Sequence, residues 1–164
     1  MTAYDASEWT DFFVAAAGAS AALAGLVFVA VSINVDRILR FAGLPDRALA
    51  TVMLLLSVVL VSLIALIPGQ PRGVLAAELL AVGVLFGAYI LRLTRRSMAG
   101  HERRAAQTVG HWLLVAMGTV PVVVGAVSLL AETGGGLYWV AGGLVLATTG
   151  AVANAWVLLV EILR

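Results

Sequence analysis

The chain has no cysteine and no lysine among its 164 residues. The absence of cysteine excludes disulfides, thiolate metal sites and cysteine nucleophiles. Charged residues are scarce, at 12% of the chain, whereas soluble domains carry about a quarter. The net charge of +1 gives no reason to expect nucleic acid as a partner. The two histidines, His101 and His111, are too far apart to form a helical metal-ligand pair.

Apolar residues are in large excess instead, at 62% of the chain with a mean hydropathy of +1.07. A soluble fold of this length cannot hide so much apolar surface, because small domains keep much of their area exposed. Lipid must cover the excess, so we expect an all-α integral membrane protein. The richness in alanine, glycine and valine, with arginine as the sole basic residue, is typical of a GC-rich bacterium. We therefore expect a multi-pass protein of the bacterial cytoplasmic membrane.

Five apolar stretches are long enough to cross a hydrocarbon core of about 30 Å, which takes about 20 residues. The predicted transmembrane helices of this single membrane domain, residues 1–164, are 12–35, 48–67, 73–91, 109–131 and 137–160. Pro68, Gly69 and Pro71 separate the second helix from the third. Pro121 falls inside the fourth, where we expect a kink rather than an end, because neighbouring helices can satisfy the freed carbonyl.

The arginines predict the orientation, since short cytoplasmic loops carry an excess of them. With segment 92–104 in the cytoplasm, nine of the ten arginines fall inside and only Arg72 falls outside. This arrangement puts the N-terminus outside and the C-terminus in the cytoplasm. It requires an odd number of spans, so the charge pattern favours five over four.

The first predicted helix carries small residues along one face, with acids at both ends. Steps of three and four residues define this small-residue stripe, whose members are Glu8, Asp11, Ala15, Gly18, Ala22, Gly25, Val29, Ser32 and Asp36. Small residues allow another backbone to approach closely, which is how membrane helices pack. In a ring of subunits the same face would line a pore with acids at each mouth, a pattern suited to cations. Packing is the more common outcome.

Glu78 is an ionisable residue inside the third predicted span. A charge at the centre of a membrane helix costs at least about 2.5 kcal/mol and usually signals function. Glu78 follows Arg72 by six residues, however, which puts it about 8–9 Å deep at about 1.5 Å per residue, near a helix N-terminus whose dipole favours an acid. Two interpretations stay open: an interfacial carboxylate that reaches water, and a proton- or cation-binding group.

A candidate polar cluster lies near the predicted inner boundary, where three helices begin or end. Its members are His111, Asn154 and Glu161. Asn154 follows the small residues Gly143, Ala147 and Gly150 on the fifth helix. The better supported alternative to a functional cluster is that Asn154 hydrogen-bonds a neighbouring helix, a contact worth about 0.6 kcal/mol on average.

A family resemblance is carried by the segments WTDFFVAAAGASAALAGLVFVAVSINVDRIL, LPDRA and LIPGQPRG. They resemble a family of small bacterial polytopic membrane proteins with a first helix of the form G-A-x-A-A-L-x-G-L-x-F-V-A-x-S-I-N. The likeness covers roughly the first half of the chain. Such proteins are sometimes named modulators of a membrane AAA protease, which implies a membrane protein partner. The resemblance marks residues 32–34 and the turn at 68–72 as family features and supplies no catalytic residues.

Three functions remain after these observations. The first is a homo-oligomeric, cation-conducting pore lined by the first helix, since several small-residue faces exceed what one small bundle needs. The second is a non-catalytic regulatory or assembly subunit of a larger membrane complex. An enzyme is the least supported, because the chain has no nucleophile elbow, P-loop or dinucleotide fingerprint. We expect no cofactor.

Overall fold

The structure is a computed structural model that describes residues 2–41, 43–98 and 105–163. Over these residues the chain forms helices and no strand, which confirms the predicted all-α class. Two short 3₁₀ helices, η1 (Thr2–Tyr4) and η2 (Ala6–Trp9), come first. The remaining helices are α1 (Thr10–Ile33), α2 (Val35–Arg40), α3 (Leu44–Ala65), α4 (Arg72–Met98), α5 (Ala105–Ala131) and α6 (Leu137–Leu163).

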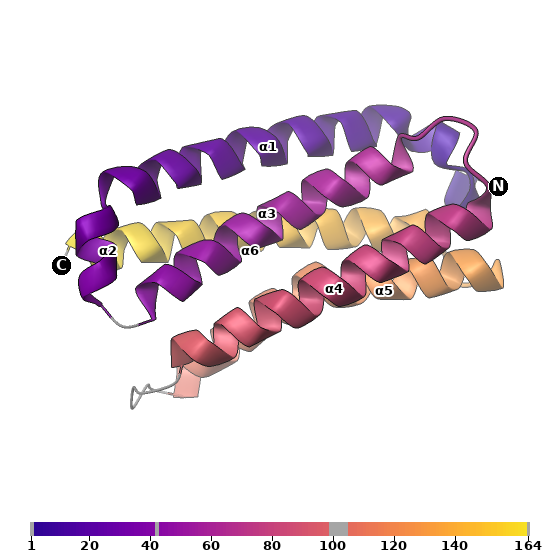
Figure 1. Ribbon diagram of the computed structural model, residues 1–164. Coiled ribbons are helices and arrows are strands. Elements are labelled where there is room, and N and C mark those ends of the chain that lie inside the picture. The colour runs from indigo at the N-terminus through magenta and orange to yellow at the C-terminus, as the bar shows by residue number, and fades with distance from the viewer. Residues whose placement is uncertain (1, 42, 99–104, 164) are drawn as a thin grey trace.

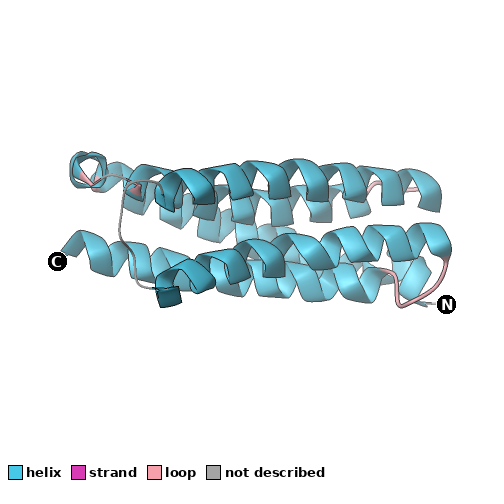
Figure 2. Cartoon of the chain, turned by 90° about the horizontal axis from the view of Figure 1, so that it is seen from below, coloured by secondary structure: helices cyan, strands magenta, loops and turns pink. Residues whose placement is uncertain are grey.

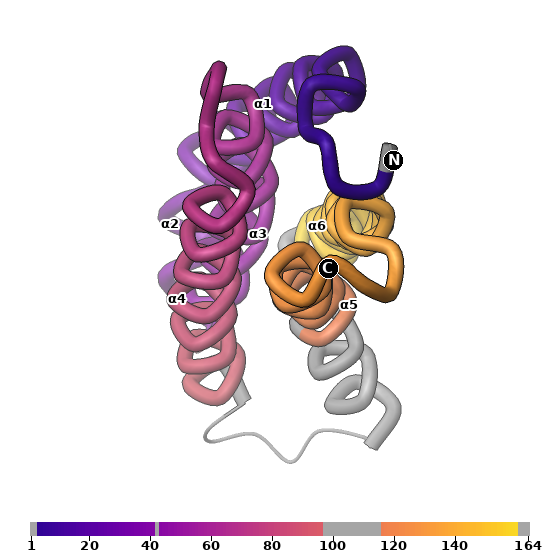
Figure 3. The backbone as a smooth tube through the Cα atoms, turned by 90° about the vertical axis from the view of Figure 1, so that its right-hand side faces the viewer, coloured from indigo at the N-terminus to yellow at the C-terminus, as the bar shows by residue number. Residues whose placement is uncertain are grey.

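The five long helices run alternately in opposite directions along one axis (Figures 1 and 2). The N-terminus and the turns at 66–71 and 132–136 lie at one end, which we call the amino end. The short helix α2 and the C-terminus lie at the other, the carboxyl end (Figure 1). Each long helix packs on the next one along the chain, and α6 returns to α3. Seen from the amino end, α1 lies at the edge of the bundle (Figure 3).

The lengths and apolarity of the helices fit a membrane-embedded bundle. Among the described residues, four segments are long and apolar enough to cross a bilayer: Ala6–Ile33, Leu44–Ala65, Arg72–Arg96 and Leu137–Val160. Within α5, the apolar part whose side chains the structure describes is Ala116–Ala131. The helix continues through Pro121.

Several helices extend beyond the apolar stretches that predicted them. Gly43 has a left-handed backbone, with φ of 85°, and Pro45 occupies the first turn of α3. This helix therefore begins at Leu44, four residues before the predicted start. The helix α4 continues to Met98 through an arginine-rich end, because arginine is a good helix former. The short helix α2 was not predicted as a helix.

Glycines bring α4, α5 and α6 close together. A Cβ atom on Gly125 of α5 would lie 2.6 Å from Cγ2 of Val140 on α6. A Cβ atom on Gly83 of α4 would lie 3.0 Å from Cγ2 of Val123 on α5. Such close approach is how helices pack when no hydrophobic drive acts between them. A Cβ atom on Gly143 of α6 would lie 3.1 Å from Cβ of Pro121, so small residues of both α4 and α6 pack against α5.

Candidate functional site

The small-residue stripe points away from the bundle. Its members on α1 are all exposed, as are Glu8 on η2 and Asp36 on α2. The two buried residues of α1, Phe13 and Ser20, lie on the opposite face by the helical period of 3.6 residues. Only 6% of the apolar stretch of α1 is buried, against 50% of that of α3. One side of α1 therefore packs on the bundle, and the stripe is left exposed by the part of the chain that the structure describes.

The glycines of the stripe confirm that this face is open. A Cβ atom on Gly18 or Gly25 would meet no described atom within 4 Å. Asn34 interrupts the helix after Ile33, with its Nδ2 donating to the carbonyl of Ala30 at 2.8 Å. The two outermost acids of the stripe, Glu8 and Asp36, thus belong to neighbouring elements rather than to α1.

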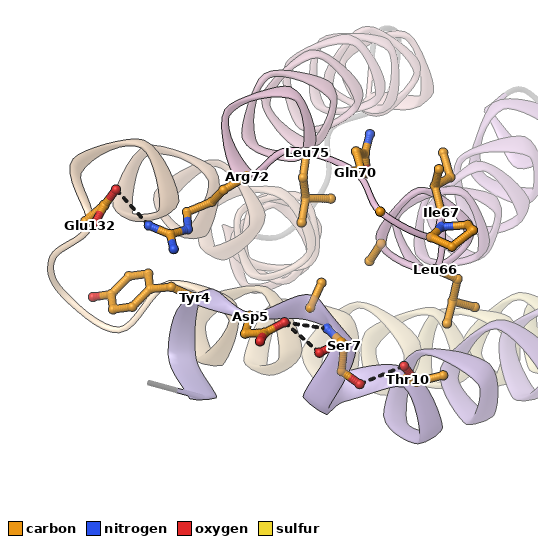
Figure 4. Close-up of a pocket in the computed structure, with 14 residues that line it drawn as sticks. Tyr4, Asp5, Ser7, Thr10, Leu66, Ile67, Gln70, Arg72, Leu75 and Glu132 are labelled. Carbon is orange, nitrogen blue, oxygen red and sulfur yellow. Dashed lines mark hydrogen bonds and ion pairs between the residues drawn. The ribbon is translucent and has the colours of Figure 1, made fainter.

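A pocket of about 870 Å³ opens at the amino end, between the N-terminal segment and the turn that joins α3 to α4 (Figure 4). Leu66, Ile67 and Leu75 are among its apolar lining residues. Arg72 forms an ion pair with Glu132 at one side, with 2.7 Å between Nη1 and Oε1. Both side chains are well exposed, at 42% and 69%, so this pair contributes about 0–1 kcal/mol.

Contacts with the turn at 132–136 hold the N-terminal segment beside this pocket. The backbone N–H of Gly135 donates to the hydroxyl of Tyr4 at 3.1 Å. The ring of Trp9 meets that of Tyr138 edge to face, with 4.8 Å between centroids. Gly136 has φ of 46°, and a Cβ atom there would clash with the carbonyl oxygen of Ala3. A glycine is therefore required where the segment crosses the turn.

Asp5 is an exposed acid of the pocket and caps η2. Its Oδ1 accepts hydrogen bonds from the hydroxyl of Ser7 at 2.7 Å and from the backbone N–H of Ser7 at 3.0 Å. These two bonds, the hydroxyl first, hold the pKa of Asp5 below its ordinary value, and the positive charge of Arg72 adds a smaller effect. Asp5 therefore keeps its negative charge at neutral pH.

Glu78 lies near the amino end of α4 and is half-buried. Its carboxylate accepts a hydrogen bond from Nε2 of Gln70, which belongs to the turn between α3 and α4. This contact ties Glu78 to the end of the bundle, which favours the interfacial interpretation over a site in the middle of the hydrocarbon core.

Asn154 hydrogen-bonds a neighbouring helix, α3, which confirms the alternative to a functional cluster for this residue. It joins Arg47 and Thr51 in what we call the buried polar cluster. Nε of Arg47 donates to Oδ1 of Asn154 at 2.9 Å, and Nδ2 of Asn154 donates to Oγ1 of Thr51 at 2.5 Å. Arg47 is only 6% exposed and Thr51 only 1%. The cluster joins α3 to α6 near the carboxyl end. The side chains of His111 and Glu161 lie outside the described residues.

Sequence reasoning missed this cluster because the second predicted helix began at residue 48, which left Arg47 in a loop and Thr51 without a polar partner on its face. The available signal was Pro45, which is favoured in the first turn of a helix. A helix that begins at Leu44 puts positions 47 and 51 on one face, four residues apart. Thr51 confirms this register, since its hydroxyl donates to the carbonyl of Arg47 at 3.0 Å.

One further polar contact joins α1 to α6. The hydroxyls of Ser20 and Thr148 lie 3.2 Å apart, and Ser20 is 1% exposed. Among the described residues, no three histidine or acidic side chains come together as a metal site. Neither a family model, nor a curated protein, nor a solved structure matches this chain. A function must therefore be argued from the surfaces and clusters described above.

Proposed function

We propose that the chain is a non-catalytic, multi-pass protein of the bacterial cytoplasmic membrane that forms homo-oligomers through the exposed face of α1. The observation that carries this proposal is the outward direction of the small-residue stripe. Gly83 and Gly87 of α4 and Gly143 of α6 face close neighbours in the bundle, whereas a Cβ atom on Gly18 or Gly25 of α1 would meet no described atom within 4 Å. In lipid, small residues favour helix contacts because they let two backbones come close.

The dimensions of the stripe suit a second copy of the same helix. From Ala15 to Val29 it extends about 21 Å at about 1.5 Å per residue, most of the thickness of a hydrocarbon core. An interface between identical faces related by two-fold symmetry is self-complementary. Two copies of α1 can therefore pack along their length without any other surface changing.

A cation-conducting pore is the second candidate. The observation that favours it is the exposure of Asp11 and Asp36, which stand near opposite ends of α1. Against it, the stripe between Ala15 and Val29 offers only alanine, glycine and valine. A hydrophobic constriction of that length gates by dewetting, so ions would meet a barrier. A regulatory subunit would use the same face for a helix of another protein; the family resemblance implies a membrane protein partner but no residues that bind it.

The orientation is part of the proposal. The exposed arginines Arg37, Arg40, Arg92 and Arg96 belong to α2 and to the end of α4, at the carboxyl end, whereas Arg72 begins α4 at the amino end. The excess of arginine in cytoplasmic loops supports a cytoplasmic carboxyl end and five spans.

Disulfide cross-linking tests the oligomer directly, because the chain has no cysteine of its own. We expect Ala22→Cys to give cross-linked dimers in oxidised membranes. The matched control is Ala88→Cys, which is exposed on α4 and should stay monomeric. Equal cross-linking of the two variants, or none at position 22, would contradict the proposal.

Liposome conductance separates the pore from a packing interface. A pore predicts a cation current that Asp11→Ala reduces. A packing interface predicts dimers by cross-linking and no current. A regulatory subunit predicts that Ala22→Cys cross-links to a different protein in native membranes and not to itself.

A further inference from the structure

An apolar cleft of about 120 Å³ lies between α1 and α6, in the half of the bundle nearer the carboxyl end. Its lining residues are all apolar: Leu26, Val27, Ala30, Val31, Ala155, Leu158 and Leu159. The cleft exists because α1 packs mainly on α3 and makes few contacts with α6. These α1 residues are not members of the small-residue stripe, so the cleft is independent of the proposed oligomer interface.

The short helix α2 lies at the carboxyl ends of α1 and α6, the two helices that line the cleft (Figure 1). Its Ile38 is 2% exposed and belongs to a cluster with Leu158, against which Val31 also packs. Leu158 and Val31 are lining residues of the cleft. Ile38 therefore fixes α2 beside the residues that form the cleft wall.

The rest of α2 has the composition of a helix at a membrane surface. Leu39 is 67% exposed and Phe41, which follows the helix, is 51% exposed. Arg37 and Arg40 are exposed as well, and Asp36 is the acid beside them. A helix with basic residues and large exposed apolar residues lies in the interface, with its apolar groups at the headgroup boundary.

We propose that α2 and the α1–α6 cleft together bind an anionic phospholipid. The cleft takes part of an acyl chain, since its wall offers only apolar contacts. Arg37 and Arg40 hold the headgroup phosphate, because guanidinium groups pair well with phosphate oxygens. The helix that carries these arginines lies at the carboxyl end and the apolar cleft lies further inside the bundle, the same order as the headgroup and the chain of a lipid. Within α2 itself two arginines stand against one acid, Asp36, so the helix carries a net positive charge that favours an anionic headgroup over a zwitterionic one.

Native mass spectrometry of the detergent-purified chain tests this site. The probes are phosphatidylglycerol and phosphatidylcholine with the same acyl chains. We expect phosphatidylglycerol to bind several-fold more tightly than phosphatidylcholine. In the R37Q/R40Q variant the affinity for phosphatidylglycerol should fall about fivefold for each arginine removed. Binding of phosphatidylcholine should change little in this variant.

The matched control is R92Q/R96Q, which removes two exposed arginines of α4 at the same end. This variant should leave the affinity of the tightest phosphatidylglycerol site unchanged. An equal loss in the two double variants would show a diffuse surface charge and overturn the proposal, as would equal affinity for the two lipids. Competition by inorganic phosphate alone, without lipid, would also overturn it, because the cleft would then have no part in binding.

A second pair of variants tests the cleft. Ala155→Leu narrows the cleft and should weaken the binding of both lipids, since the acyl chain is common to them. Ala153→Leu, exposed on α6 and not a lining residue, should have no effect. Unchanged lipid affinity in Ala155→Leu would show that the cleft is not used.

Discussion

Arg47 and Asn154 are 107 positions apart in the sequence, and their side chains meet inside the bundle through a 2.9 Å hydrogen bond from Nε to Oδ1. The bond fixes the register of α3 against α6, because Asn154 also donates to Thr51, one turn further along α3. A guanidinium removed from water needs such acceptors, since an unsatisfied buried polar group costs far more than a satisfied one contributes.

Replacing Asn154 by leucine should therefore destabilise the bundle. The variant removes an acceptor from Arg47 and a donor from Thr51, so we expect a loss of about 1–3 kcal/mol in the free energy of unfolding. Asn154→Asp keeps an acceptor for Arg47 and should lose less. Unfolding by SDS titration in mixed micelles measures both. The control is Thr149→Ala, whose hydroxyl bonds only its own helix at an exposed position. Equal stabilities of Asn154→Leu and the control would contradict this role.

Two glycines of the α5–α6 hairpin provide a matched test of close packing. A Cβ atom on Gly125 would lie 2.6 Å from the side chain of Val140 and 3.0 Å from its backbone nitrogen, whereas one on Gly142 would meet no described atom within 4 Å. Overpacking costs about 1–3 kcal/mol, so Gly125→Ala should be destabilised by this amount. Gly142→Ala should be neutral or slightly more stable, because alanine favours helix. Similar unfolding curves for the two variants would show that α5 and α6 are not in this contact.

The hydroxyl pair between Ser20 and Thr148 should contribute modestly to the docking of α1. Interhelical hydrogen bonds in membranes average about 0.6 kcal/mol. A double-mutant cycle with Ser20→Ala and Thr148→Val isolates the pair from the bond that Thr148 makes to the carbonyl of Leu144. We expect a coupling free energy of that size. A coupling of zero would show that the two hydroxyls do not interact.

Hydropathy predicted the helices well because it reports which solvent a segment needs. The all-α class and the apolar stretches follow from that single property. Hydropathy does not locate the end of a helix where polar residues continue it. For this reason Arg47 was placed in a loop and α2 was not predicted. The bond of Asn154 to another helix was predicted, because an amide in lipid must find a partner, but Arg47 as that partner depended on the register of α3.

The direction of a small-residue face could not be predicted from sequence. Gly18 of α1 and Gly83 of α4 both lie in apolar runs of the sequence. A Cβ atom on Gly83 would nevertheless lie against Val123, whereas one on Gly18 would meet no described atom within 4 Å. Only the arrangement of the helices decides which face is inside. The hydrogen bond of Glu78 could not be predicted either, because its donor, Gln70, belongs to the turn between α3 and α4.

The exposed glycines of α1 separate oligomerisation from folding. Gly18→Leu with Gly25→Leu adds side chains where the chain has open space, so the fold should tolerate both. The same side chains would keep a second α1 at a distance. We expect native mass spectrometry to show monomers for this double variant and unchanged helix content by circular dichroism. Persistent oligomers would show that copies associate through another face.

The N-terminal segment should respond to pH through Asp5. Its pKa lies below the ordinary value of 3.8, mainly because the hydroxyl of Ser7 donates to it. A carboxylate with a lowered pKa stabilises the folded segment above its unfolded pKa, and this stabilisation is lost as the pH falls through the folded pKa. The attachment of η2 should therefore loosen only in acid, below about pH 4, where the carboxylate becomes protonated.

Carboxyl-carbon NMR of Asp5 in micelles measures this pKa directly. Ser7→Ala should raise the pKa of Asp5 toward its ordinary value, because it removes the largest cause of the shift. Arg72→Gln should raise it less, since the guanidinium acts only through its charge. Thr10→Ala is the control: its hydroxyl donates to the carbonyl of Ser7 and not to Asp5, so the pKa should stay where it is. A larger change in Arg72→Gln than in Ser7→Ala would show that the charge of Arg72, and not the cap, holds Asp5 ionised.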